Sequence, residues 1–451
     1  MKMYNEYKPS IYPWLYSIPA HWEERFLQSV CVPKCKKNDE NCVTTVLSLS
    51  YGRIIRKQNI YAGLVAKDFS TYQIVQNGDI ILRFTDLQND HKSLRTGLVT
   101  ETGIITSAYT CITPRINSAY LHYLLHAYDL QKVFYGMGAG VRQSIGFKDV
   151  RHMFVQVPPR PEQDQIVRFL DWKVSSVNKL ISVKRKQIAL LHERQGVHIS
   201  HIVTHGLRNG VAAKDSGAEW LGDIPEHWRT MRCKYLFSER DERSQDGSEQ
   251  HLSMSQKYGL VADSQLDERR MLSESYVGGK LCNKDDLVLN RLKAHLGVFA
   301  LAPQSGVISP DYTVLRPNTE RILPSFAETV LKSDCCRGEL HIRVRGIIEG
   351  FWRLYTDDFN TIVLPVPPLD EQAEIMEYIV EFHDKAKKYE DTLTQEISSL
   401  QELKARLISD TVTGKIDVRG IQIPEYEFAK ENNDTENNES MEEMEGGIYE
   451  E

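Results

Sequence analysis

Hydrophobic residues near the end of the chain recur at alternating steps of four and three, which is the spacing of a coiled-coil seam. Nine of the ten positions on this seam are apolar, and the tenth is Glu396. One long helix cannot bury such a stripe by itself, so the pattern predicts a partner helix. The apolar positions are Ile375, Ile379, Phe382, Ala386, Tyr389, Leu393, Leu400, Leu403 and Leu407.

An earlier segment of the chain has a similar but less regular pattern. Its equivalent positions keep five apolar residues, whereas Lys173, Lys184 and Gln187 interrupt the stripe. Each of the two helices would hold about forty residues, so at 1.5 Å per residue each would be about 60 Å long. We therefore expect the two helices to pair within the chain. The apolar residues of the earlier seam are Ile166, Leu170, Val177, Leu180 and Leu191.

The two helix starts belong to an internal repeat. "VPPRPEQDQI" at residues 157–166 matches "VPPLDEQAEI" at residues 366–375, at an offset of 209 residues. "KPSIYPWLYSIPAHW" at 8–22 matches "KDSGAEWLGDIPEHW" at 214–228, at an offset of 206 residues. Each half runs from an IPxHW segment through a variable block to a VPP loop and a long helix, so the chain is a tandem duplication.

The variable blocks combine short β-branched runs with helical stretches. "DIILRF", "GLVTE" and "SAYTCIT" are typical of strands, and "SAYLHYLLHAYDLQKVFY" is typical of a helix. The fold class is therefore mixed α/β, with two globular domains separated by two long coiled-coil helices in a tandem pseudo-two-fold repeat. We predict domain 1 at residues 1–155, the first long helix at 156–205, domain 2 at 206–364, the second long helix at 365–420 and a tail at 421–451.

Charge is distributed unevenly along the chain. Residues 425–451 hold eleven acidic residues and one lysine, a net charge of −10. Because the whole chain carries −7, residues 1–424 carry +3, which permits a nucleic-acid partner without demonstrating one. The tail is rich in Asn and Glu and poor in core-forming residues, so we expect it to be disordered.

The composition indicates a cytoplasmic protein. There is no apolar run long enough for a membrane span and no signal peptide at the start. The eight scattered cysteines are typical of free thiols in a reducing compartment. "CVPKC" has no suitable fourth ligand, and His198, His201 and His205 are not repeated in the second half, so we predict no metal site.

Catalytic motifs are not recognisable in the sequence. "YGMGAGVRQ" at 135–143 fails the GxGxxG pattern because Val141 stands at the third glycine position. "VGGK" and "TGK" lack the rest of a phosphate-binding loop, and there is no NPPY-type adenine methyltransferase motif. We therefore expect a chain that performs no catalysis and binds no cofactor.

These motifs, in this order and spacing, resemble the specificity subunit of type I restriction-modification systems. The resemblance rests on the repeated VPP…EQ helix starts, on "WLGDIPEHW" and on "VTGKIDVR", and it extends to about Val418. It implies that each variable block is a target recognition domain for one half of a split DNA sequence. It also implies that the long helices pack antiparallel as a spacer, and half-sites about one helical turn, ~34 to 36 Å, apart suit such a spacer.

The resemblance also implies the partners. Double-stranded DNA, two modification (methyltransferase) subunits that use S-adenosylmethionine and two restriction (endonuclease and translocase) subunits that use ATP and Mg would assemble with this chain. Basic residues in the variable blocks are then the candidate DNA contacts, because Arg and Lys bind guanine edges and phosphates. We predict Arg83, Lys92, Arg95, Arg142, Arg291, Lys293, Arg343, Arg345 and Arg353.

Two alternatives belong to other classes of protein. A self-contained restriction or modification enzyme with cryptic catalytic residues would need a further segment, and no unassigned block is long enough to hold one. A purely structural coiled-coil scaffold would explain the helices, but not two divergent α/β blocks in equivalent positions. The DNA-specificity subunit therefore explains more of the sequence than either alternative.

Overall fold

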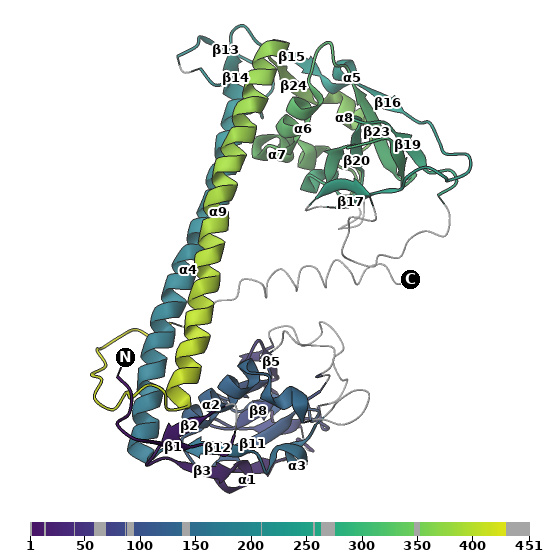
Figure 1. The fold of residues 1–451 in the computed structure, drawn as a ribbon. Coiled ribbons are helices and arrows are strands. Elements are labelled where there is room, and N and C mark those ends of the chain that lie inside the picture. Colours follow the sequence, from purple (N-terminus) through teal and green to yellow (C-terminus); the bar gives the residue numbers. More distant parts are fainter. Residues whose placement is uncertain are drawn as a thin grey trace. The chain divides into compact units, whose positions relative to one another are not determined.

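The chain forms two compact units (Figure 1). Unit 1 combines Met1–Arg185 with Thr394–Glu451, and unit 2 is Lys186–Leu393. A computed structural model describes residues 2–12, 15–39, 41–57, 69–85, 87, 94–137, 145–208, 210–255, 258–262, 276–346 and 352–429. Each unit contains one of the two repeated blocks together with part of each long helix.

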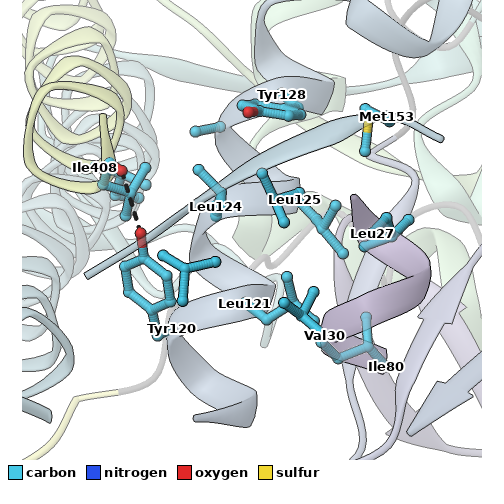
Figure 2. Packing of buried hydrophobic residues seen from close by; sticks show 14 of the residues in the cluster. Leu27, Val30, Ile80, Tyr120, Leu121, Leu124, Leu125, Tyr128, Met153 and Ile408 are labelled. Atoms are coloured by element: carbon cyan, nitrogen blue, oxygen red, sulfur yellow. Dashed lines mark hydrogen bonds between the residues drawn. The ribbon is translucent and has the colours of Figure 1, made fainter. Parts of the chain in front are cut away.

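The core of unit 1 is an antiparallel sheet covered by a helix. Strands β4 (Cys31–Lys34), β11 (Thr110–Pro114), β8 (Ile80–Leu82) and β9 (Thr96–Leu98) form the sheet in that order. Helix α2 (Ser118–Leu130) is capped by the preceding Asn117, whose side chain accepts a hydrogen bond from Tyr120 N at 3.0 Å. Its buried face carries Leu121, Leu124 and Leu125, which pack with Leu27 and Ile80 (Figure 2).

Smaller elements complete unit 1. β3 pairs with β12, which leads into the first long helix, and β1 with β2, β5 with β6 and β7 with β10 form further antiparallel pairs. Their bounds are β1 Tyr7–Pro9, β2 Ser17–Pro19, β3 Glu23–Phe26, α1 Leu27–Val30, β5 Leu47–Ser50, β6 Arg53–Arg56, β7 Gln73–Val75, β10 Gly103–Ile105, η1 Val133–Gly136, α3 Phe147–Val150 and β12 Phe154–Val157.

Unit 2 repeats this plan. Its sheet has the order β16 (Phe237–Arg240), β23 (Tyr312–Pro317), β20 (Leu287–Asn290) and β21 (Phe299–Leu301), and α6 (Pro324–Lys332) takes the part of α2. The remaining elements are β13 Ala213–Asp215, β14 Asp223–Pro225, β15 Arg229–Arg232, α5 Cys233–Leu236, β17 Leu252–Ser255, β18 Gly259–Ala262, β19 Lys280–Cys282, η3 Ala294–Leu296, β22 Gly306–Ile308, α7 Asp334–Arg343, α8 Thr356–Thr361 and β24 Val363–Val366.

The two long helices, α4 (Arg160–His205) and α9 (Leu369–Val412), pair antiparallel in each unit. In unit 1, Lys404 Nζ donates to Asn178 Oδ1 at 3.3 Å, and Lys184 forms an ion pair with Glu396. Lys184 interrupts the first apolar stripe and Glu396 the second, and the two residues face each other.

In unit 2, the cross-helix contacts follow the same direction. His192 Nε2 lies 3.1 Å from Glu390 Oε2, and His198 Nε2 lies 3.1 Å from Tyr378 Oη. A step toward the C-terminus of α4 therefore corresponds to a step toward the N-terminus of α9, as the resemblance implies.

The seam between the helices differs from the predicted one at three positions. Leu180, Tyr389 and Leu403 are 52%, 49% and 54% exposed, so they do not belong to it. The neighbouring residue points inward at two of these turns: Ile181 is 1% exposed, and Lys404 makes the cross-helix bond. Ile166, Leu170, Val177, Ile375, Ile379, Ala386, Leu393 and Leu407 are buried, whereas Leu191, Phe382 and Leu400 are partly buried.

The repeated Glu-Gln pair explains the repeated motifs, because it joins the IPxHW segment to the helix start. In unit 1, Glu162 accepts hydrogen bonds from Tyr4 Oη at 2.7 Å and Trp22 Nε1 at 3.1 Å, and lies 2.8 Å from His21 Nε2. In unit 2, His227 Nε2 lies 2.7 Å from Glu371 Oε2. We call these contacts joint 1 and joint 2.

The glutamine of each pair closes its joint in the same way. Gln163 Nε2 donates to Pro158 O at 2.8 Å, and Asn117 N donates to Gln163 Oε1 at 3.0 Å. Gln372 Nε2 donates to Pro367 O at 2.8 Å, and Leu323 N donates to Gln372 Oε1 at 2.7 Å. Each glutamine thus connects the VPP loop to the start of the helix that covers the sheet.

The end of the other long helix completes each joint through a glycine. Gly414, which follows α9, has φ +79°, and a Cβ there would lie 2.3 Å from Pro19 Cδ and 3.2 Å from Trp22 Cζ3. Gly206, which follows α4, has φ +80°, and a Cβ there would lie 3.2 Å from Trp228 Cζ2. A left-handed backbone and close packing both require glycine at these two helix ends.

The segment after α9 packs against unit 1. Gln165 Nε2 donates to Ile421 O at 2.8 Å, and Ser175 Oγ donates to Glu427 O at 3.0 Å. Ala429 N in turn donates to Ser175 Oγ at 2.7 Å. The prediction that the disordered tail begins at residue 421 is therefore wrong for 421–429, because these residues satisfy buried polar groups of α4. Residues 430–451 lie outside the described part of the chain.

None of the helices that the structure describes combines the length and the apolar character needed to cross a membrane.

We expect Gly414→Ala to destabilise joint 1, because the new Cβ meets Pro19 and the φ is unfavourable for an L residue. The free energy of unfolding should fall by at least about 1 kcal/mol, measured by urea denaturation of the full chain. Gly420→Ala is the matched control, since its Cβ meets nothing within 4 Å. Equal stabilities of the two variants would contradict this role of Gly414.

Candidate nucleic-acid interface

Three of the predicted arginines meet at one place in unit 2. Arg345 and Arg353 exchange backbone hydrogen bonds, with N to O distances of 2.9 Å and 2.8 Å. Leu354 N donates to Arg291 O at 2.9 Å, so the chain beyond β20 lies next to this pair. The sequence placed these arginines in one block, and the structure brings them together.

Their side chains differ in how firmly they are held. Arg291 Nε donates to Asp311 O at 2.7 Å, and Arg345 forms an ion pair with Asp358 although its side chain is 69% exposed. Arg353 is exposed and makes no ion pair with the residues that the structure describes. Arg353 is therefore the arginine of this group whose guanidinium is available to an anionic ligand such as a DNA phosphate or to a guanine edge.

An aromatic cluster that the sequence analysis missed lies next to these arginines. The ring centroids of His295, His341 and Trp352 are 5.4 to 5.7 Å apart. Burial, and then the nearby His341, lower the pKa of His295. The signal available in the sequence was the adjacency of Trp352 to Arg353, since aromatic rings beside basic residues are typical of nucleic-acid contacts.

The other two candidates in unit 2 are placed differently. Arg343 lies on α7 and is held by Glu339 and by Thr361 Oγ1, so its guanidinium already has acceptors within the fold. Lys293 precedes η3 and is partly buried, and its backbone N donates to Asn290 O at 3.1 Å. Arg343 therefore stabilises the contact between α7 and α8, and its contact with DNA stays a prediction.

In unit 1, one candidate is buried. Arg95 is fully buried, its Nη1 donates to Thr85 O at 2.6 Å and its guanidinium lies 5.6 Å from the centre of the Tyr135 ring. The prediction that Arg95 contacts DNA is therefore wrong, because the guanidinium is buried and bound to Thr85 and Tyr135. Arg83 is partly buried, and Lys92 and Arg142 lie outside the described residues.

In the described part of the chain, no three His, Cys, Asp or Glu side chains lie close enough together to bind a metal ion. His201 and His205 stack with ring centroids 4.6 Å apart, and His198 packs on Phe382 at 4.7 Å. These histidines therefore cover the end of α4 and its contact with α9.

Comparison with known proteins gives relatives in sequence and in fold. No family model matches the chain. Over 313 aligned residues the chain is 24% identical to the type I restriction enzyme MjaX specificity subunit of Methanocaldococcus jannaschii. The aligned residues cover 68% of this chain and 69% of that protein. The resemblance inferred from the motifs is therefore confirmed by a curated relative.

Two solved structures match the chain, and the first of them shares its fold. A chain from the structure describing complex assembly and conformational transition of the type I R-M system matches with a TM-score of 0.56 and 16% identity, over 89% of this chain and 100% of that chain. The HsdS subunit from Thermoanaerobacter tengcongensis matches with a TM-score of 0.44 and 15% identity, over 89% and 99%.

We expect Arg95→Met to lower the free energy of unfolding by about 1 to 3 kcal/mol, because Thr85 O loses a buried donor. Lys36→Met, at an exposed position, should change it by no more than about 0.5 kcal/mol. Urea denaturation measures both variants. A fully stable Arg95→Met protein with weakened DNA binding would restore Arg95 as a DNA contact.

Proposed function

We infer that this chain belongs to the specificity subunits of type I restriction-modification systems and that it selects the DNA sequence on which its partners act. The repeated motifs, the curated relative and the shared fold all support this assignment. The observation that carries it is the tandem repeat of one α/β block and one joint, with the same strand order in both copies.

Each block reads one half of a bipartite DNA target. The two copies share their sheets and their joints, whereas the loops that carry basic residues differ in sequence and length. A conserved frame with divergent loops gives two readers of different specificity, so the recognised sequence is asymmetric. In unit 2 the reading surface is centred on Arg291, Arg345 and Arg353, with Trp352 beside them.

The long helices are the second binding surface, for protein partners. They leave apolar side chains exposed on α4 (Leu180 and Val183 in unit 1, Leu190 and Val197 in unit 2) and on α9 (Tyr378, Val380 and Tyr389 in unit 2, Leu403 in unit 1). Exposed apolar side chains repeated along a helix favour the docking of other helices. Near two-fold repetition suits two identical modification subunits, with two restriction subunits added to them.

The chemistry takes place in these partners. Modification subunits with S-adenosylmethionine would methylate an adenine in each half-site, and restriction subunits with ATP and Mg would translocate and cut unmodified DNA. This chain determines which DNA sequence is recognised. It binds DNA through basic and aromatic side chains and positions the partners on the helices. As a DNA-binding subunit it would act in the cytoplasm.

Exchange of one block tests the assignment. Residues of about 25 to 155 are replaced by the corresponding block of another specificity subunit, and the chimera is expressed with its modification subunit. Methylome sequencing should show a new sequence in one half of the target and the original sequence in the other half. An unchanged methylated sequence would contradict the proposal.

We expect Arg353→Ala to weaken binding of the target DNA by about 1 to 3 kcal/mol if the guanidinium reads a base. Arg316→Ala is the matched control, because Arg316 is also an exposed arginine of unit 2 but lies on β23. Fluorescence anisotropy with the assembled modification complex measures both. Arg353 would be removed from the interface if its variant bound DNA as tightly as the control.

A further inference from the structure

Unit 2 contains a cavity where α6 and α7 meet the two long helices. Its volume is about 330 Å³. Its walls come from α4, from the end of α6 and the start of α7, and from α9. The residues that decide its chemistry are Ile199, Thr329, Lys332, Arg337 and His383.

The internal repeat shows what stands at the same positions in unit 1. Asn117 N and Leu323 N bind equivalent glutamines, so α2 and α6 correspond at an offset of 206 residues. Thr329 therefore corresponds to Tyr123. On the long helices, where the offset is 209 residues, His383 corresponds to Val174.

In unit 1 these positions carry larger or more apolar side chains. Tyr123 and Val174 pack against the core of unit 1, and Tyr123 Oη donates to Asp171 Oδ1 at 2.7 Å. In unit 2 the shorter Thr329 turns its hydroxyl back to Ser325 O at 2.8 Å. A tyrosine replaced by a threonine therefore opens space in unit 2 that a ring occupies in unit 1.

A segment of the chain itself lies beside this place in unit 1. We call residues 418–429, "VRGIQIPEYEFA", the C-terminal strap. Burial and the Asp171 carboxylate raise the pKa of Tyr426. The strap begins with a turn that Ile421 N closes on Val418 O at 3.1 Å, and beyond it the chain forms neither helix nor strand up to Ala429. Its end alternates acidic with aromatic residues, and Ser175 holds it through Glu427 and Ala429.

The cavity in unit 2 has the chemistry to hold such a segment. Ile199 and Thr329 provide apolar surface, and Lys332, Arg337 and His383 provide three basic groups against two carboxylates. Lys332 Nζ forms a close ion pair with Glu328 Oε1 at 2.7 Å. The Arg337 side chain is 52% exposed, and its Nη1 lies 3.9 Å from Asp334 Oδ1, which is a long distance for an ion pair. A carboxylate on a ligand would therefore meet a weakly paired guanidinium.

We propose that this cavity binds an extended acidic-aromatic segment of a partner protein, in the way that the C-terminal strap lies on unit 1. An aromatic ring packs against Ile199 and Thr329, and a neighbouring carboxylate binds Arg337 and Lys332. The proposal rests on the proposed function only in that this chain is expected to assemble with protein partners. It assigns to unit 2 a docking site separate from the exposed apolar side chains of the spacer.

A labelled peptide tests the site directly. The probe is a fluorescein-labelled peptide with the sequence of residues 418–429, titrated with the full chain and followed by anisotropy. We expect saturable binding that weakens at least about tenfold in Thr329→Tyr, which restores the ring of unit 1, and in Arg337→Glu. A peptide that carries Tyr426→Ala and Phe428→Ala should bind at least about tenfold more weakly than the parent.

Matched controls separate the cavity from other effects. Lys388→Glu makes the same kind of charge change on the exposed face of α9 and should alter the peptide affinity by less than about twofold. Thermal melting of Thr329→Tyr within a few degrees of the parent chain excludes loss of the fold. No saturable binding, or binding that Thr329→Tyr and Arg337→Glu leave unchanged, would overturn the proposal.

The peptide could instead replace the strap on unit 1. In that case Gln165→Ala would change its affinity and Thr329→Tyr would not, and the proposal would fail. DNA binding of the assembled complex, measured on the same variants, separates this outcome from the proposed function. Loss of specific DNA binding by the parent complex would contradict the proposed function while leaving the peptide result intact.

Discussion

The structure depends on the two joints, in which a glutamate and a buried glutamine fix the start of each long helix; the glutamate is buried in joint 1 and partly buried in joint 2. Glu162 binds the IPxHW segment, Gln163 binds the VPP loop and the start of α2, and Gly414 brings the end of α9 against Trp22. Joint 1 therefore unites segments from the beginning, the middle and the end of the chain. Hydrogen bonds to a buried carboxylate are costly to lose, so the angle at which each helix leaves its block is strongly determined.

This constraint explains why one chain can carry two different DNA readers. The strand order of the sheets, the His–Glu contact and the glutamine bonds of the joints repeat, so each block is attached to the helices in a similar way. The loops of the blocks are free to differ, because they do not take part in the joints. A new target half can therefore arise by exchange of one block, provided that the IPxHW segment, the Glu-Gln pair and the helix-end glycine are kept.

The sequence predicted the duplication, the mixed α/β blocks, the long helices and the family resemblance, because these depend on repeated motifs and on periodic apolar positions. It misplaced Leu180 and Leu403, because a strict seven-residue pattern does not follow the faces of these helices, where Ile181 and Lys404 turn inward. It could not show that Arg95 is buried or that Trp352 meets two histidines edge to face, because such contacts join residues far apart in the sequence. Charge alone does not distinguish an arginine that closes the fold from one that faces a ligand.

The central claim is that two unlike blocks on one repeated frame read the two halves of a single DNA target. The most direct measurement is methylome sequencing of cells in which the chain is expressed with its modification subunit, against cells that lack the chain. The account predicts adenine methylation, dependent on the chain, within a bipartite and asymmetric sequence whose two halves are separated by unread base pairs. Methylation of one continuous site, or methylation that persists without the chain, would contradict it.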